Sequence, residues 1–485
     1  MIRKKPKIET ILDDIEAKGF ALSQRSMDYD GGSIEILYIQ QLTDRVSLMD
    51  FVIRPLSLYV RQESNAGRGL KAKTVAQNVL YVDDYELQSD GEEVQAFILD
   101  GKVVILLPDD DDEYIVINLK KVEHRSISEP TLEYTLRGPR DCFVENLDTN
   151  LSLIRYRNKD AKLRICQYKV GKRTKTNVAM FYIEDIANDK VVSLMKQRIQ
   201  AINVDGIGDS GELEVFLQNS NLNLFPQMGA VERSDMAQHL LHEGKVLVLV
   251  DGSGLALSAP KCFPEYFFSC DDRYDNMYFG LFMRILRYAS FSIALYATCF
   301  YVGISEFHID ALPSRYVISL AEMRASVPFP PIIGGLMLEF VVELLREALL
   351  RVPKQIGPAV GIVSAIVIGQ AAISAGIFSP LLLILASISL LASFVMPDFA
   401  LINPIRILKF IAILCTGLLG FYGLVLFSCV LLIHFVSIES FGVPYFAPFA
   451  PFNRYDFVRS FIFNISISPF RPRYLKNKDN TRRKV

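Results

Sequence analysis

Three groups of polar residues have the side-chain types that metal binding or catalysis uses. His239 and His242 lie three apart in a segment with helical spacing, but no third ligand is evident beside them. The acidic run 109–113 lies between two apolar strands, and a continuous run of acids usually repels itself into solvent. Asp251-Gly252-Ser253 has the composition of a tight turn. The sequence therefore predicts surface or core histidines, a solvated hairpin turn and no metal site.

Motifs of catalysis are missing. No P-loop, GxSxG, HExxH or GxGxxG stands in the required context, so we expect no enzyme activity and no cofactor. The cysteines are scattered and form no CxxC pair, which predicts free thiols in a reducing compartment rather than disulfides or zinc ligands. They are Cys142, Cys166, Cys262, Cys270, Cys299, Cys415 and Cys429.

A stripe of acidic residues follows one face of an otherwise apolar segment, residues 331–350. Glu339, Glu343 and Glu347 recur every four residues, and Arg346 lies three residues from Glu343, where the two can pair. A charge in hydrocarbon costs ~2.5–3.5 kcal/mol, so this face must meet protein, a water-filled cavity or the membrane interface. Two interpretations stay open: a vestibule that attracts cations, and a salt-bridged amphipathic helix at the interface.

The next apolar segment, residues 355–378, has two distinct faces. Small residues recur every four positions on one face and would allow close helix packing: Gly357, Gly361, Ala365 and Gly369. A neighbouring face has spacings of three and four: Val360, Val363, Val367, Gln370 and Ser374. In a symmetric ring the second face would form an apolar constriction that closes by dewetting, with a polar mouth at Gln370 and Ser374. Simple packing of both faces inside a bundle is the alternative.

Long uncharged stretches place these segments in a membrane. They are residues 288–305, 355–397 and 410–438. A membrane-spanning helix needs about 20 apolar residues. The second stretch breaks at Ser379-Pro380 into helices at 359–378 and 381–396, whereas the third is expected to be one long or tilted span. We therefore predict an all-α membrane bundle of about four or five helices over residues 284–438, in contact with lipid.

Charge divides the chain into two halves. Residues 1–283 carry a net charge of −10 and residues 284–485 a net charge of +8. An acidic half without basic stripes argues against nucleic-acid binding. Arg284 and Arg287 are expected to anchor the first span at the interface, with the N-terminal half on the cytoplasmic side. The basic tail from Arg454 onward is expected either to touch anionic lipid headgroups or to stay exposed and disordered.

The N-terminal half has the pattern of a soluble mixed α/β protein. Strands are predicted at 33–40, 96–100, 102–107, 114–119, 163–170, 177–183, 246–250 and 254–257. Helices are predicted at 8–18, 42–56 (ending at Pro55), 190–202 and 209–219. An interruption at Pro130 and Gly138-Pro139 separates two cycles of this pattern. We expect two α/β subdomains, residues 1–135 and 136–283, and an interfacial segment with a basic tail over residues 439–485.

Several strings, in order along the chain, are more specific than these patterns. They include Arg137-Gly138-Pro139-Arg140, Phe143-Val144-Glu145-Asn146, Leu224-Phe225-Pro226-Gln227, Val327-Pro328-Phe329-Pro330, Glu343-Leu344-Leu345-Arg346-Glu347-Ala348, Ile368-Gly369-Gln370-Ala371 and Ser440-Phe441-Gly442-Val443-Pro444-Tyr445. Together they closely resemble the A subunit of GerA-type spore germinant receptors from endospore-forming bacteria, over about residues 30–470. Cys142 and Ser234 depart locally from the family pattern, which tends to have proline at the second position.

The resemblance implies a receptor in the inner membrane of the dormant spore. It would act with a transporter-like B-type subunit that binds nutrient and with a lipoprotein C-type subunit. It would form a homo-oligomer that acts as a nutrient-gated cation channel. Two other functions stay open. One is a secondary transporter, although the membrane region is small and shows no internal duplication. The other is a membrane scaffold that conducts nothing.

Overall fold

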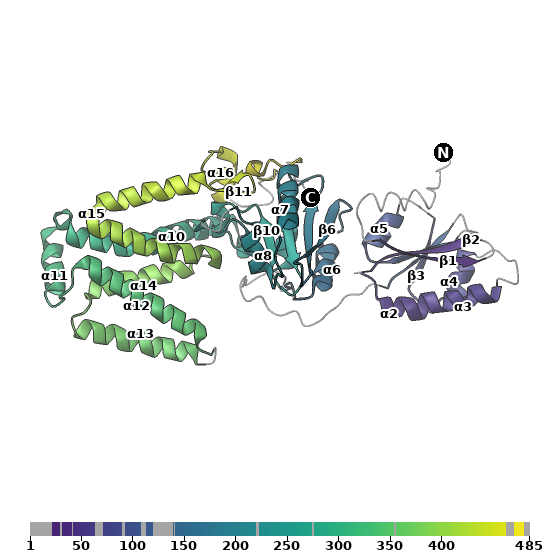
Figure 1. Cartoon of the computed structure of the whole chain (residues 1–485), viewed down its shortest axis with the longest axis horizontal. Coiled ribbons are helices and arrows are strands. Elements are labelled where there is room, and N and C mark those ends of the chain that lie inside the picture. Colours follow the sequence, from purple (N-terminus) through teal and green to yellow (C-terminus); the bar gives the residue numbers. More distant parts are fainter. Residues whose placement is uncertain are drawn as a thin grey trace.

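Two α/β units and a bundle of long helices follow one another along the longest axis of the molecule (Figure 1). The computed structural model describes residues 22–29, 32–40, 42–63, 71–89, 93–107, 113–119, 139, 141–219, 223–273, 276–353, 356–461 and 470–479. Residues 22–119 are named subdomain 1, residues 141–273 subdomain 2, and residues 277–437 the helical domain. The predicted helix 8–18 and most of the expected boundary near residue 135 lie outside the described residues, so the domain limits stay predictions.

Subdomain 1 is built on a five-stranded antiparallel sheet in the order β1-β2-β4-β5-β3. Its strands are β1 (Leu22–Tyr29), β2 (Gly32–Ile39), β3 (Tyr85–Gln88), β4 (Val103–Leu106) and β5 (Tyr114–Ile117). Its helices are α2 (Arg45–Leu48), α3 (Arg54–Glu63), α4 (Ala72–Asn78) and α5 (Val94–Leu99). Side chains of β2, β4 and β5 alternate between a core under α2 to α4 and a second core under α5. Both faces of the sheet are therefore covered.

Two predictions for subdomain 1 are wrong. Residues 96–99 belong to helix α5 and not to a strand, because Val94 and Ile98, one helical turn apart, both pack on the sheet. Gly101, with φ of 84°, follows the end of this helix. The helix predicted to end at Pro55 instead continues to Glu63. A π-helical turn at Met49–Ile53 precedes the proline, which sits in the first turn of α3, where its missing N–H is tolerated.

Subdomain 2 repeats the architecture with a five-stranded antiparallel sheet in the order β6-β7-β9-β10-β8. Its strands are β6 (Leu163–Val170), β7 (Thr176–Ile183), β8 (Gly229–Val231), β9 (Val246–Val250) and β10 (Ala256–Ala259). Its helices are α6 (Leu147–Arg157), α7 (Asp189–Ala201), α8 (Ser210–Leu217) and α9 (Ser234–His242). Asn146, Asn188 and Asp209 cap the starts of α6, α7 and α8 with their side chains. The predicted tight turn between β9 and β10 is confirmed, with Gly252 at φ of 87°.

The helical domain contains α10 (Met277–Glu306), α11 (Ser314–Arg324), α12 (Pro331–Arg351), α13 (Gly357–Ser374), α14 (Pro380–Phe394) and α15 (Ile402–Ser437). The break predicted at Ser379-Pro380 is confirmed, because Ser379 caps α14 and Pro380 opens it. Among the described residues, two helices are long and apolar enough to cross a membrane, Met277–Glu306 and Phe399–Ser437. The expected number of spans stays a prediction.

The prediction of one long span at 410–438 is wrong, because α15 reverses direction at Gly420. This residue has φ of 62° and ψ of −150°, which no helix contains. Asp398, just before α15, pairs with Lys261 of subdomain 2, and Phe435, near its end, packs on Phe225 of the same subdomain. Gly420 itself lies beside His308, at the opposite end of α10. The helix is thus a hairpin whose two ends both lie at subdomain 2 (Figure 1).

The chain after α15 packs back onto subdomain 2. It contains β11 (Glu439–Ser440), β12 (Val443–Pro444) and α16 (Arg454–Phe461). Phe441 and Leu475 are buried in the core beneath α7. Arg459 donates to Glu243 at 2.6 Å, and Asn477 donates to the backbone oxygen of Glu243 at 2.6 Å. Residues 470–479 are thus packed on subdomain 2 with Lys476 and Lys478 exposed, and contact of the tail with lipid headgroups stays a prediction.

Candidate functional site

Aromatic rings fill the junction between subdomain 2 and the helical domain. Phe225 and Phe263 both pack on Phe435 of α15, with ring centroids 4.6 Å and 4.5 Å away. Phe267 stacks on Tyr288 of α10 at 4.1 Å. Such pairs stabilise by about 0.5–1.5 kcal/mol each beyond the burial of their area. A displacement of subdomain 2 would thus be transmitted to the end of α15 and the start of α10.

Arg284 and Arg287, expected as interfacial anchors, are instead buried against Asp272. Arg284 Nε lies 3.1 Å from the Asp272 carboxylate, and Arg287 Nη1 lies 2.8 Å from it. Arg287 also donates to the backbone oxygen of Phe267 at 2.9 Å. The two arginines fasten α10 to the end of subdomain 2 and do not extend to headgroups, because Asp272 offers both of them a buried counter-charge.

A second ionic contact ties subdomain 2 to the hairpin α15. Lys261, at the end of β10, donates to Asp398 and lies over the ring of Tyr266, 4.2 Å from its centroid. Burial raises the pKa of the neighbouring Glu214, although a hydrogen bond from Gln218 and the charge of Lys261 oppose that rise. Lys261 is therefore the positive group that two carboxylates face at this contact.

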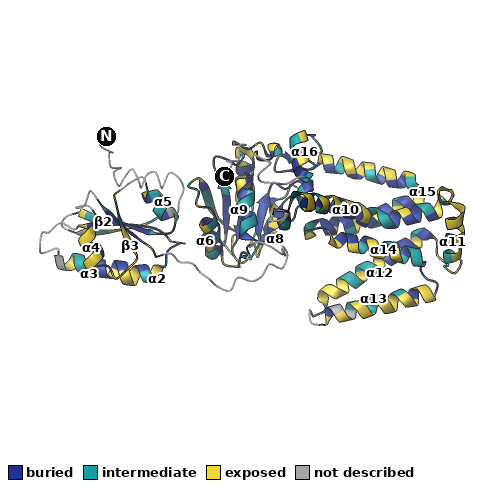
Figure 2. Ribbon diagram, turned by 180° about the vertical axis from the view of Figure 1, so that it is seen from behind, coloured by how far each residue is buried: buried dark blue, intermediate teal, exposed yellow. Residues whose placement is uncertain are grey.

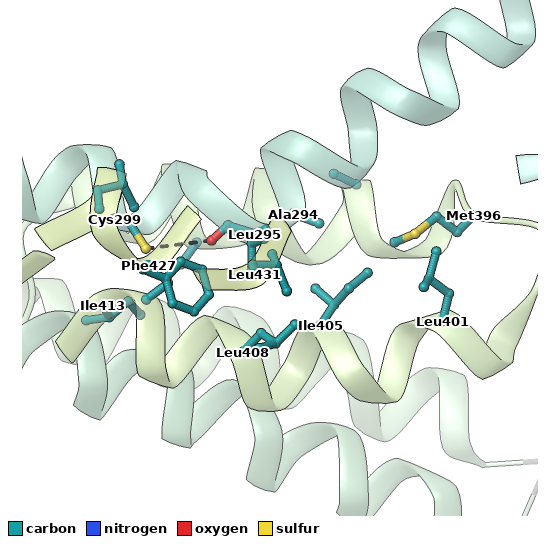
Figure 3. Close-up of a cluster of buried hydrophobic side chains, with 14 of the residues drawn as sticks. Ala294, Leu295, Cys299, Met396, Leu401, Ile405, Leu408, Ile413, Phe427 and Leu431 are labelled. Carbon is teal, nitrogen blue, oxygen red and sulfur yellow. Dashed lines mark hydrogen bonds between the residues drawn. The ribbon is translucent and has the colours of Figure 1, made fainter. Parts of the chain in front are cut away.

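An apolar core joins α10, α14 and both halves of α15. Leu295, Met396, Leu408 and Phe427 are among its buried members. Figure 3 shows these side chains between the helices, with the Cys299 thiol donating to the backbone oxygen of Leu295 at 3.6 Å. The six cysteines whose side chains the structure describes are free, as predicted. Burial raises the pKa of the Cys262 thiol well above its usual range, so that thiol stays protonated.

The acidic stripe of α12 begins with a fully buried ion pair. Glu339 lies 2.8 Å from the Lys409 ammonium of α15 and accepts a hydrogen bond of 2.7 Å from the Thr298 hydroxyl of α10. The side chains of Glu339 and Lys409 are 1% and 7% exposed. Both carboxylate oxygens are thus satisfied by protein groups. Removing one partner of such a pair typically costs about 3–5 kcal/mol, because the other charge stays buried and unpaired.

The other members of the stripe are paired as well. Glu343 accepts from Arg406 Nε of α15 at 2.6 Å and lies 3.6 Å from Arg346, the partner expected from spacing. Glu347 pairs with Arg351 at 2.7 Å, and both are exposed. In this arrangement Glu339 and Glu343 join helices together. The alternative role as a cation vestibule stays a prediction, and Glu347 is the member of the stripe that solvent or ions reach most easily.

The proposed constriction lies on α13, at the outer edge of the helical domain. Val363 and Val367 are 60% and 59% exposed, and Gln370 and Ser374 are exposed too. Val360 belongs to the same helix, but its side chain is outside the described residues. Figure 2 shows α13 exposed along most of its length, with α12 beside it. The face that sequence spacing singled out is thus open at Val363, Val367, Gln370 and Ser374 in a single chain.

The small residues of α13 meet their neighbours unevenly. A Cβ at Gly361 would lie 3.2 Å from Leu349 of α12, and one at Gly369 would lie 3.7 Å from Leu383 of α14. Gly357 has nothing within 4 Å of that position, and Ala365 is exposed. Gly361 therefore lies close to α12, Ala365 adds to the open surface, and the packing role of the ridge stays a prediction.

The remaining polar candidates have structural partners. His239 lies 3.0 Å from Glu243, and His242 lies 3.4 Å from Asn158. Asp251 accepts from the backbone N–H of Leu147 at the start of α6. The acidic run 109–113 lies, except for its last residue, outside the described residues. In the part of the chain that the structure describes, no group of three or more potential ligand side chains could hold a metal ion.

Sequence reasoning missed the basic partners of the stripe. Lys409 and Arg406 lie three apart, just before the uncharged stretch from residue 410, and they face Glu339 and Glu343, which lie four apart. Two cations at helical spacing beside a long apolar run were the available signal. An antiparallel pairing of the two helices would have matched both pairs at once.

The comparisons with known proteins agree along nearly the whole chain. Residues 7–474 match the model of the family described as Bacillus/Clostridium GerA spore germination protein. Spore germination protein B1 of Bacillus subtilis is 36% identical over 413 residues, which cover 85% of this chain and 84% of that protein. Spore germination protein GerLA of Bacillus cereus is 35% identical over 447 residues, which cover 92% and 90%.

One solved structure is also similar in part. The crystal structure of the N-terminal domain of the A subunit of the Bacillus megaterium spore germinant receptor GerK3 matches at 23% identity with a TM-score of 0.41. The match covers 53% of this chain and 96% of that one. The family match and the full-length relatives lead to one conclusion: the chain belongs to the GerA family of spore germination proteins.

Proposed function

We propose that this chain is the A subunit of a nutrient germinant receptor in the inner membrane of the spore. Several copies would form a cation channel that opens when nutrient is sensed. The receptor would also contain a transporter-like B-type subunit and a lipoprotein C-type subunit, as the family resemblance implies. The germination role of the relatives supports the receptor assignment, and no catalytic step belongs to the proposal.

Membrane insertion is supported by the character of the helical domain. Met277–Glu306 has the length and apolarity of a span, and Phe399–Ser437, which reverses at Gly420, is apolar in both of its halves. The outer faces of α10 and α15 carry large apolar side chains, among them Phe282, Phe300 and Val430, that need lipid or protein around them. Because α10 leaves subdomain 2 and α15 returns to it, an even number of crossings is expected, with the described part of the tail beside subdomain 2.

The open face of α13 is the observation that carries the channel proposal. α13 exposes large apolar side chains on several sides, Val363 and Val367 among them, and these side chains must be covered by lipid or by other chains. In a ring of copies the same face would form an apolar constriction, which closes a pore by excluding water. Gln370 and Ser374, one to two turns further along, would keep one mouth of that pore wet.

The test is conductance of the receptor in liposomes, with and without nutrient. Val363→Ser is expected to raise the cation leak without nutrient by about tenfold or more, because a hydroxyl at the constriction favours water there. Ile362→Ser is the matched control, since Ile362 is 63% exposed but points about 100° away around the helix. If both variants leak cations equally, or if Val363→Ser retains cations as well as wild type does, this face does not line the pore.

The two other functions make different predictions in the same liposomes. A transporter would move solute at a saturable rate and would need no oligomer. A scaffold would leave the liposomes tight in every condition, whichever partner subunits are present. The ionic and aromatic junction with subdomain 2 is compatible with a scaffold, but the open, apolar face of α13 is explained only by lipid or by other subunits.

A further inference from the structure

Helices α12 and α15 pack along an antiparallel seam with two different halves. A Cβ at Gly417 of α15 would lie 2.3 Å from Ile332 of α12, and one at Gly335 of α12 would lie 3.7 Å from Ile413 of α15, so glycines bring the backbones together in the first half. The second half consists of the pairs Glu339–Lys409 and Glu343–Arg406.

The seam ends where the charges end. Up to Glu343 the inward face of α12 is covered, whereas Leu344 and Leu350, on its outer surface and last turn, are 55% and 74% exposed. Residues 347–350 are all exposed. The hairpin of α12 and α13 therefore projects from the bundle only after Arg346, which contacts Ser393 and Phe394 of α14, and it rejoins the bundle at Ala372 and Phe378, which are buried. Val363 and Val367 lie on the projecting part.

The pair Glu339–Lys409 lies deep in the helical domain. Thr298, which donates a hydrogen bond to Glu339, falls near the middle of the uncharged stretch 288–305 and is fully buried. If the domain spans a membrane, this position is near the bilayer midplane, far from water on both sides. Separating the two charges there would leave both without a partner. The free-energy cost of that separation exceeds what the binding of one ligand usually transfers between two sites.

We propose that Glu339, Lys409 and Thr298 form a permanent pivot that stays intact in the closed and the open receptor. The pivot holds α12 against α10 and α15, and it confines the movement that opens the pore to the projecting part of the hairpin. This inference rests on the proposed channel. Its residues are positioning residues, since they act on Val363 and Val367 only through the helix that carries them.

The first test uses the complete receptor in spores and measures cation release after nutrient addition. Glu339→Gln and Lys409→Met are each expected to reduce the response by about tenfold or more, because each leaves one buried charge unpaired. Lys409→Arg keeps the charge and is expected to respond within about threefold of wild type. Glu347→Gln is the matched control on the same helix, because its pair with Arg351 is exposed, and it should respond normally.

The double variant Glu339→Gln/Lys409→Met separates a pivot from a lock that breaks on opening. It removes both charges, so no unpaired charge remains. A pivot predicts that the receptor stays closed without nutrient and that the nutrient dose for half-response changes by less than about threefold. Cation release without nutrient would instead identify a lock and overturn the proposal. A normal response from both single variants would overturn it as well.

Thermal unfolding of the purified full chain in detergent keeps the test decisive if a single variant fails to reach the membrane. The two single variants should each unfold at a lower temperature than wild type. The loss in unfolding temperature of the double variant should be much smaller than the sum of the two single losses. Additive losses would mean that the residues are not coupled and would refute the pivot. If coupling is found but no variant, wild type included, conducts ions in liposomes, the channel proposal fails while the attachment of α12 stands.

Discussion

Replacing Gly420 by alanine tests the reversal of α15, because a continuous helix and a hairpin predict changes of opposite sign in the free energy of unfolding. In a continuous helix, glycine is less favourable than alanine by about 0.5–1 kcal/mol, so the variant would be more stable. At φ of 62° and ψ of −150°, alanine is strained by about 1–3 kcal/mol instead. The new Cβ would also lie 2.8 Å from Cε1 of His308. The hairpin therefore predicts a loss where the straight helix predicts a gain.

The measurement is the free energy of unfolding of the full chain in mixed micelles. Gly369→Ala is the matched control, since Gly369 is helical and its nearest contact would be 3.7 Å away. That variant is expected to gain about 0.5 kcal/mol or more. The two variants should therefore differ by about 1.5–4 kcal/mol, with opposite signs. If Gly420→Ala gains stability together with Gly369→Ala, the reasoning about the reversal is refuted.

Two further predictions concern the soluble half and its junction. Asp398→Asn leaves Lys261 with a neutral partner but keeps the hydrogen bond that caps the Ala400 N–H. The unfolding free energy should therefore fall by about 1–3 kcal/mol, and the nutrient response should weaken. An unchanged response would mean that this contact does not couple subdomain 2 to the helical domain. Burial works to raise the pKa of Asp141, but hydrogen bonds from Arg157 and Ser234 outweigh it and lower the pKa below 3.8. The stability that this carboxylate contributes is thus present at neutral pH and is lost as the pH falls through its folded-state pKa. Asp141→Asn should lower the unfolding temperature at pH 7, and the difference from wild type should vanish in acid; a difference that persists there would contradict this account.

Local patterns predicted the regular elements of the chain where one signal dominated. Runs such as Val246–Val250 became buried strands, and Ser379-Pro380 became a helix start. The prediction of a strand at residues 96–100 is wrong because a short apolar run fits a strand and a helix equally well. Only the sheet surface, which Val94 and Ile98 cover together, decides between them.

The rest depended on contacts between distant residues. The stretch 410–438 has no charge and no proline, and its three glycines, Gly417, Gly420 and Gly423, do not tell which of them reverses the chain; packing of Gly420 beside His308 decides it. Likewise, the spacing of Glu339 and Glu343 indicated a face that must avoid lipid, but not which cations it meets. The packing of the basic tail on subdomain 2 could not be predicted from its composition, because Glu243, the partner of Arg459, lies more than 200 residues earlier.

The packing of the last described residues on subdomain 2 means that the core of this subdomain is completed only after the helical domain has been synthesised. Phe441, Val443 and Leu475 fill the core of subdomain 2, yet they are translated after every helix of the helical domain. A nascent chain thus carries an open apolar site on subdomain 2 throughout the synthesis of these helices. That site closes only when a correctly returned C-terminal segment reaches it, so a chain threaded with the wrong orientation keeps exposed apolar surface.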